Sequence, residues 1–353
     1  MTEGATDEVI ALVEGGAGRL RLDRPKAIHA LNQPMCAAMI EALLGWHADP
    51  AIELVMIDHA EGRGFCAGGD VVALARSGAD DGAEARAFFF TEYRLNHLLF
   101  TYAKPTVAFM DGITMGGGVG ISQPCRWRVA TERTMFAMPE SGIGLFPDVG
   151  GGWYLSRLPG RMGQYVALTG ERLSGADCLA LGLATHYVPS ERLDGLKAAL
   201  AAEPRRLETL LDEASEPAPP AAILGHRAEI DRLFASDRLE DILAALEADG
   251  GEWAAKQRAI LATKSPQTCK VALRQLTEGA RLTDFADEMR MEYAIAVRVV
   301  QRPDFAEGVR ALLVDKDNAP RWTPPTPEGV TDGLLDTIFA PLPEADAWTP
   351  IRR

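Results

Sequence analysis

Short apolar runs in the first half of the chain end in glycine-rich loops that lead toward helices. The run at 52–57 passes into the loop 61–64, and the run at 106–110 passes into the cluster Gly116-Gly117-Gly118. Helical spacing of apolar residues covers 34–46 and 83–102. Because strands that alternate with helices form a sheet covered by helical layers, the pattern predicts an α/β domain whose strand ends carry the chemistry.

The rest of the chain divides at a proline-rich stretch. Two short runs, 9–13 and 19–22, predict a hairpin, and residues 216–220 predict a break or linker. The tail 320–350 is rich in proline, so we expect irregular structure along the surface. Between linker and tail, four segments have helical patterns: 221–249, 252–261, 266–277 and 282–298.

Composition limits the classes of partner. The net charge of -14 and the pI near 5.0 argue against non-specific binding to nucleic acid or to anionic membranes, since both need a basic surface. No apolar run is long enough to span a bilayer. The first eight residues are polar and acidic, unlike a signal or transit peptide. Five cysteines without a C-x-x-C pair indicate reduced thiols, and we expect a cytoplasmic protein.

Two glycine loops are candidates for an oxyanion hole, the pair of N–H donors that holds a carbonyl oxygen. The first is Gly64-Phe65-Cys66-Ala67-Gly68-Gly69-Asp70, and the second runs from Asp111 to Gly120. Small residues let a backbone approach a ligand closely, and each loop could supply one N–H to the charge that grows during acyl transfer. Either cluster alone is weak evidence, because a lone run of glycines is more often a turn or a packing device.

A third segment, residues 138–152, contains two carboxylates. Glu140 and Asp148 lie in an otherwise apolar, glycine-punctuated stretch. Apolar surroundings raise the pKa of a carboxyl group, which suits general acid–base catalysis. The alternative is structural: Glu140 as an acid at a helix start after Pro139, and Asp148 as a turn residue.

These three segments together resemble the crotonase (enoyl-CoA hydratase/isomerase) superfamily. The motifs I-T-M-G-G-G-V-G, F-A-M-P-E and G-L-F-P-D-V-G-G-G are similar to its 3-hydroxyisobutyryl-CoA hydrolase branch. The resemblance implies a crotonase (ClpP-like) spiral core of ββα units over residues 1–200. It also implies a helical C-terminal region, 201–353, that closes the acyl pocket. The expected reaction is hydrolysis of a short-chain 3-hydroxyacyl-CoA, with 3-hydroxyisobutyryl-CoA as substrate.

The resemblance also implies roles for individual residues. Backbone N–H groups of Gly69 and Gly117 would form the oxyanion hole, and Glu140 would be the catalytic glutamate, acting as general base or as nucleophile through a mixed anhydride. Asp148 would act beside it, and Glu92 would contact the substrate. The residues implied to hold CoA are Lys26, Ala27, Ala30, Ala67 and Gly68.

One departure separates hydrolase from hydratase. Hydratases of the superfamily use two glutamates, and the first would fall at Gly120, which has no side chain. The hydrolase branch also has glycine there. Two alternatives stay open: an enoyl-CoA hydratase or isomerase, and an acyl-CoA-binding protein without catalysis.

We expect neither metal nor resident cofactor. The six histidines lack metal-ligand spacing, and no histidine motif pairs with Cys66 as a nucleophile. CoA would enter only as part of the substrate. The resemblance further implies a homo-oligomer of the trimer type as one assembly.

Overall fold

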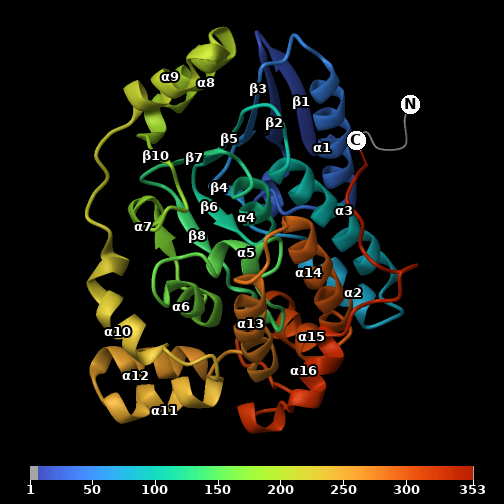
Figure 1. Ribbon diagram of the computed structural model, residues 1–353, viewed down its shortest axis with the longest axis vertical. Coiled ribbons are helices and arrows are strands. Elements are labelled where there is room, and N and C mark those ends of the chain that lie inside the picture. Colours follow the sequence, from blue (N-terminus) through green and yellow to red (C-terminus); the bar gives the residue numbers. More distant parts are fainter. Residues whose placement is uncertain (1–6, 353) are drawn as a thin grey trace.

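The chain forms two β-sheets, which lie in the upper half of the view in Figure 1, with the C-terminal helices below them. The computed structural model describes residues 7–352. The larger sheet has six strands in the order β1 (Val9–Glu14), β2 (Ala17–Leu22), β3 (Leu54–His59), β5 (Thr106–Met110), β7 (Trp127–Ala130) and β10 (His186–Tyr187). The smaller sheet has the order β4 (Gly64–Cys66), β6 (Ile113–Met115), β8 (Met135–Ala137) and β9 (Leu173–Ser174).

The chain passes repeatedly from the larger sheet to the smaller one. β3 leads to β4, β5 to β6 and β7 to β8, and a helical segment follows each pair. β1 and β2 form the predicted antiparallel hairpin, while β2, β3, β5, β7 and β10 pair in parallel. This order of elements confirms the predicted α/β class with ββα units, and it places the glycine loops after β4 and β6.

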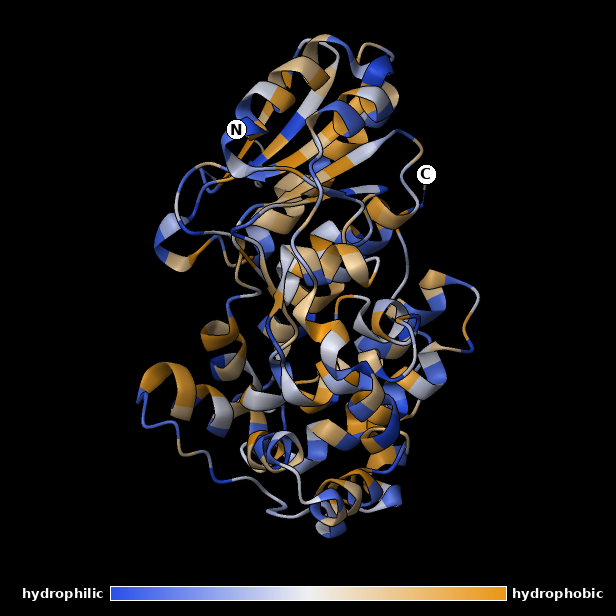
Figure 2. Cartoon of the chain, turned by 90° about the vertical axis from the view of Figure 1, so that its left-hand side faces the viewer, coloured by the Kyte–Doolittle hydropathy of each residue, from blue (hydrophilic) through white to orange (hydrophobic). Residues whose placement is uncertain are grey.

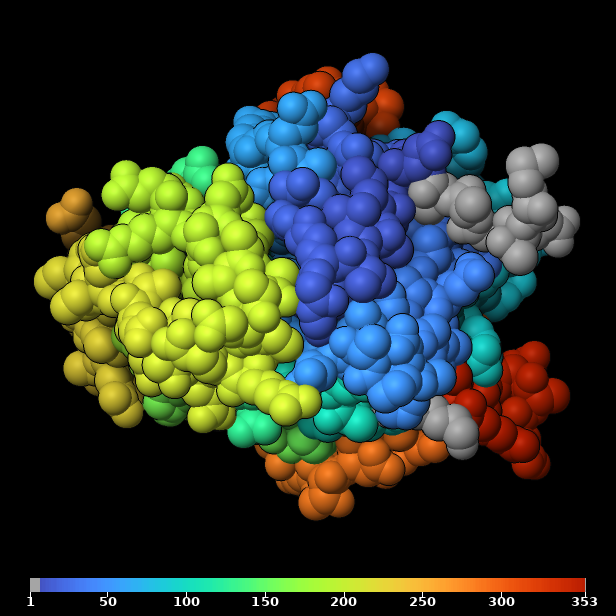
Figure 3. Space-filling view, turned by 90° about the horizontal axis from the view of Figure 1, so that it is seen from above, coloured from blue at the N-terminus to red at the C-terminus, as the bar shows by residue number. Residues whose placement is uncertain are grey.

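Both faces of the larger sheet are buried because side chains alternate along each strand. In β3, Val55 and Ile57 belong to the main core, whereas Leu54 and Met56 face a second core. The second core is completed by α8 (Leu193–Ala202) and α9 (Leu207–Ala214). Seen from above, these helices lie against the N-terminal hairpin (Figure 3), where the Gly16 N–H donates to the Ala201 carbonyl.

Helices surround the main core and most of them bury one side, so apolar and polar colours alternate around them in Figure 2. Those of the first part are α1 (Gln33–Ala48), α2 (Val71–Gly78), α3 (Ala83–Phe100), α4 (Gly117–Ser122), α5 (Gly151–Leu155), α6 (Met162–Thr169) and α7 (Gly175–Ala180). Those after the linker are α10 (Arg227–Leu233), α11 (Leu239–Asp249), α12 (Glu252–Leu261), α13 (Pro266–Gly279), α14 (Phe285–Val299), α15 (Pro303–Val309) and α16 (Asp332–Phe339). No helix in 7–352 is long and apolar enough to cross a membrane.

Two predictions about the second half were wrong. The single helical segment 221–249 is broken into a 3-10 turn, α10 and α11, because Ser236 accepts the Arg238 N–H and donates to Asp241 instead of continuing the helix. The tail 320–350 is not wholly irregular, since it contains α16, whose first turn is capped by the Thr331 hydroxyl.

The expected division at residue 200 stays a prediction. The boundary falls inside α8, which shares the second core with α9, while residues 216–220 form the extended linker that the prolines predict.

Candidate active site

Three loops of the spiral meet at one cavity of about 250 Å³. They follow β4, β6 and β8, and they contribute Gly69, Gly117, Glu140 and Asp148. α3 adds Glu92, and Ala67 and Gly68 also line the wall. The structure thus brings together every residue predicted for catalysis, the oxyanion hole and the acyl group.

The Gly69 loop is fixed from its outer side by the neighbouring chain segment. The Leu31 N–H donates to the Gly68 carbonyl (2.7 Å), and the Asp70 N–H donates to the Leu31 carbonyl (2.9 Å). Asp70 then caps α2 and binds Arg24 at 2.8 Å. Within the described chain the Gly69 N–H donates to no protein group, so it is free for a ligand.

Gly117 presents a second N–H from the first residue of α4. The first N–H groups of a helix have no partner within the helix and carry its positive dipole end. The two glycine loops touch backbone to backbone, since a Cβ at Gly116 would lie 3.2 Å from the Gly68 Cα. A Cβ at Gly117 would lie 2.7 Å from the Glu92 Oε1. Glycine is therefore required where the backbones and the carboxylate crowd the cavity.

Three buried carboxyl groups face this cavity. Burial and the charge of Asp148 raise the pKa of Glu140 well above its usual range. Burial, Asp148 and Glu140 have the same effect on the pKa of Glu92. Within residues 7–352 no ion pair within 4 Å neutralises any of the three, and one oxygen each of Glu92 and Glu140 lacks a hydrogen-bond partner. Groups held this way are poised to bind or transfer protons.

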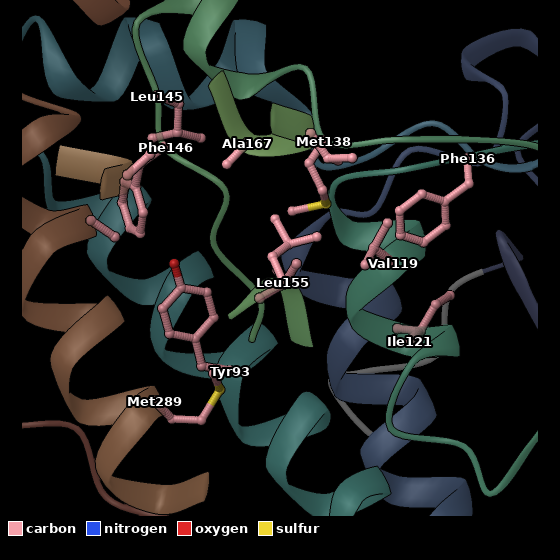
Figure 4. Close-up of a cluster of buried hydrophobic side chains, with 14 of the residues drawn as sticks. Tyr93, Val119, Ile121, Phe136, Met138, Leu145, Phe146, Leu155, Ala167 and Met289 are labelled. Atoms are coloured by element: carbon pink, nitrogen blue, oxygen red, sulfur yellow. The ribbon is translucent and has the colours of Figure 1, made fainter. Parts of the chain in front are cut away.

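Asp148 differs because it has a hydrogen-bond donor. The Tyr93 hydroxyl donates to its Oδ2 at 2.8 Å, and both side chains are buried. Burial raises the pKa of Asp148 to about 6, and the tyrosine limits the rise because it favours the charged form. Figure 4 shows the Tyr93 ring between Met289 of α14 and the segment with Leu145 and Phe146.

Part of the cavity wall is apolar, and sequence reasoning missed the residues that form it. Phe88 and Phe89 of α3 line one wall. Leu312 and Leu313 reach it from the π-helical turn Arg310–Val314, far along the chain. The stretch 307–317 carried the resemblance but gave no sign of this contact. Tyr93, next to Glu92, was missed as well.

Of the residues predicted to hold CoA, Ala67 and Gly68 line the cavity, whereas Lys26, Ala27 and Ala30 lie beside it. Lys26 and Ala27 belong to the 3-10 turn Pro25–Ala27, and Lys26 is exposed. Their turn is joined to the site because the Ala67 N–H donates to the Ile28 carbonyl at 2.9 Å. Ala30 lies on the same segment outside the cavity wall, and the role of these residues in holding CoA stays a prediction.

Cys66, the remaining nucleophile candidate, is fully buried. Burial raises the pKa of Cys66 to about 12, and its thiol faces the Gly68 carbonyl. Of the described residues that line the cavity, none is a cysteine or a histidine. The described chain also holds no cluster of metal-ligating side chains.

Comparison with known proteins decides the family. A family model for enoyl-CoA hydratase/isomerase matches residues 17–339. The chain belongs to the enoyl-CoA hydratase/isomerase family. Among relatives in this family, 3-hydroxyisobutyryl-CoA hydrolase, mitochondrial, of Danio rerio is 42% identical over 98% of this chain and 93% of that protein. The Homo sapiens protein of the same name is 40% identical over 97% and 91%.

Two solved structures are also similar over nearly their whole length. A carnitinyl-CoA dehydratase from Mycobacterium thermoresistibile superposes with a TM-score of 0.92 at 42% identity, covering 96% of this chain and 98% of that one. An enoyl-CoA hydratase from Rhodobacter sphaeroides gives 0.90 at 38%, covering 97% and 100%. These likenesses confirm the predicted crotonase fold.

Proposed function

We propose that the protein hydrolyses 3-hydroxyisobutyryl-CoA to 3-hydroxyisobutyrate and CoA, a reaction of valine catabolism. The single observation that carries the choice of hydrolysis over hydration is at Gly120. A Cβ there would lie 2.6 Å from the Val149 Cβ and 2.8 Å from the Asn96 Nδ2, so the space for a second catalytic glutamate is filled. The names of the relatives from Danio rerio and Homo sapiens support the same substrate.

In the proposed mechanism the thioester carbonyl oxygen accepts hydrogen bonds from the Gly69 and Gly117 N–H groups. These donors stabilise the negative charge that develops on that oxygen. Glu140, whose raised pKa makes it a stronger base, either removes a proton from the attacking water or attacks the carbonyl carbon itself. In the first route the C–S bond breaks as the tetrahedral intermediate collapses. The proton taken by Glu140 then passes to the CoA thiolate.

In the second route Glu140 first forms a mixed anhydride and releases CoA. CoA leaves as the thiolate. Water then hydrolyses the anhydride to the free acid and restores the Glu140 carboxylate, and the proton released in this step neutralises the CoA thiolate. Asp148 would orient the 3-hydroxyl of the acyl group or the water, held in place by Tyr93. Glu92, whose Oε1 lies 2.7 Å from where a Cβ of Gly117 would be, would contact the substrate beside the second glycine loop.

Free thiol release tests the proposal. Purified protein is mixed with 3-hydroxyisobutyryl-CoA or, in parallel, with crotonyl-CoA. A thiol reagent measures the release of free CoA, and the enoyl absorbance measures hydration of the double bond. We expect thiol from the first substrate and a near-complete loss of release in Glu140→Gln. Hydration of crotonyl-CoA without thiol release would instead establish a hydratase, the alternative supported by the names of the two similar solved structures, a dehydratase and a hydratase. Binding of both esters without turnover would establish a non-catalytic binding protein.

Three further properties follow as proposals. CoA takes part only as a component of the substrate. A trimer-type homo-oligomer is expected from the family resemblance, and light scattering after size exclusion would measure it. All five cysteines are buried free thiols, which fits a reducing compartment such as the cytoplasm. The names of the relatives place those proteins in mitochondria, so cell fractionation decides between the two.

A further inference from the structure

The loop that carries Asp148 has a strained backbone. Val149, directly after the aspartate, has φ 55°, and Gly150 has φ 92°. A β-branched residue at positive φ is a real outlier, and such strain persists only where surrounding contacts fix the conformation. Contacts outside the loop must therefore hold it in this shape.

Two buried residues of the C-terminal region supply those contacts. Gln275 of α13 donates from Nε2 to the Pro147 carbonyl (2.8 Å) and to Glu292 Oε1 (2.8 Å). Glu292 of α14 accepts the Gly150 N–H (2.7 Å) and the Gly152 N–H (3.1 Å). The backbone is thus held immediately before Asp148 and again two residues after it.

The arrangement is more than packing requires. Gln275 and Glu292 are 0% exposed, and Glu288, one helical turn before Glu292, is also 0% exposed. Burial raises the pKa of Glu288 to about 7, and burial with the Glu288 charge raises that of Glu292 well above its usual range. No ion pair within 4 Å compensates either acid in the described part of the chain. Burying carboxyl groups without a compensating positive charge is costly, so their presence behind this loop points to a role in fixing its shape.

We propose that Gln275 and Glu292 are positioning residues that aim the Asp148 carboxylate at the 3-hydroxyl of the acyl group. They touch neither substrate nor reacting atoms, and they act through the loop. The inference rests on the proposed function, because it assigns selectivity within that same reaction. It predicts that the two residues determine how well the enzyme distinguishes a 3-hydroxyacyl thioester from the same thioester without the hydroxyl.

The test compares kcat/KM for 3-hydroxyisobutyryl-CoA with kcat/KM for isobutyryl-CoA by thiol release. The ratio of the two constants is independent of the fraction of protein that is correctly folded, so it separates positioning from simple loss of stability. The variants are Gln275→Leu and Glu292→Gln. The matched control is Gln267→Leu, since Gln267 lies on the same helix, is also 0% exposed, and binds Arg302 instead of the loop.

We expect the ratio to fall about tenfold or more in both variants, since a misplacement of 1 Å in a site can cost ~10²-fold. The control should keep the wild-type ratio. Lower rates on both substrates at an unchanged ratio, or an equal fall in the control, would overturn the inference while leaving the hydrolase function in place. A wild-type protein that releases no thiol from either ester would overturn the proposed function, and the inference with it.

Discussion

Replacing Tyr93 by phenylalanine removes one hydroxyl group from the cavity wall and changes the ionisation of Asp148. The hydroxyl donates to Asp148 Oδ2 at 2.8 Å and favours the charged carboxylate, whose pKa is about 6. A hydrogen bond to a charged group contributes about 1.5–3 kcal/mol. Each pKa unit corresponds to about 1.4 kcal/mol, so the pKa should rise by about one to two units, to about 7–8.

The assay is the dependence of kcat/KM for thiol release on pH between about 5 and 9.5. If the reaction needs ionised Asp148, the acidic limb moves upward in Tyr93→Phe by the same one to two units. At pH 7 between about a tenth and a half of the variant's Asp148 would then be ionised, and at high pH its kcat/KM would approach that of the wild type. Because Glu92 and Glu140 titrate in the same cavity, the apparent pKa of the acidic limb belongs to all three carboxyl groups together. The test therefore uses only the difference in this apparent pKa between Tyr93→Phe and the wild type.

Tyr293→Phe is the matched control, because Tyr293 packs against the Tyr93 ring while its hydroxyl points to the Arg86 carbonyl. Its acidic limb should stay where the wild type has it. A Tyr93→Phe protein whose activity falls equally at every pH, with the limb unmoved, would refute the assigned link between this tyrosine and the charge on Asp148.

Further predictions concern stability and reactivity. Burial raises the pKa of Asp148 in the folded protein from 3.8 to about 6, so ionisation of this group lowers stability as pH rises through that range. In Asp148→Asn the free energy of unfolding, measured by urea denaturation, should therefore increase by up to about 3 kcal/mol at pH 8 and stay unchanged at pH 3.5. The converse pH dependence would contradict the buried charge. Gly120→Ala places a Cβ 2.6 Å from the Val149 Cβ, and denaturation should show a loss of about 1–3 kcal/mol; an unchanged midpoint would mean that the site has room. Cys66 should resist iodoacetamide at neutral pH while activity persists, and inactivation matching its labelling in peptide maps would reopen its role.

The sequence predicted the site better than it predicted the C-terminal half. Gly69, Gly117, Glu140 and Asp148 lie in loops whose chemistry is local: glycines needed for close approach and acids in apolar surroundings. Parallel strands bring the ends of β4, β6 and β8 to one place, so motifs distant in sequence converge.

The residues that escaped prediction act across long separations. Leu312 and Gln275 reach the site only through the packing of the C-terminal helices, which no local pattern specifies. Glu292 stood in the segment Met291-Glu292-Tyr293 that carried the resemblance, yet its partners are backbone N–H groups with no sequence signature. Helix 221–249 was overextended because Ser236 is a plausible surface residue of a helix until its hydrogen bonds are known.

The order in which the chain is synthesised has a consequence for when the protein can first act. The ribosome releases the glycine loops, Glu140 and Asp148 well before it releases the residues that hold the Asp148 loop in shape. Gln275 lies 128 residues after Pro147, and Glu292 lies 142 residues after Gly150. The turn that carries Glu140 also depends on a later residue, because the Ser265 N–H donates to the Ser141 carbonyl. A nascent chain stalled near residue 260 should therefore contain both glycine loops, Glu140 and Asp148 and still hydrolyse no thioester. The chain should become active once the remaining residues have been synthesised and released. Measurable turnover by the stalled chain would show that the loops carrying Glu140 and Asp148 do not need the contacts from Ser265, Gln275 and Glu292.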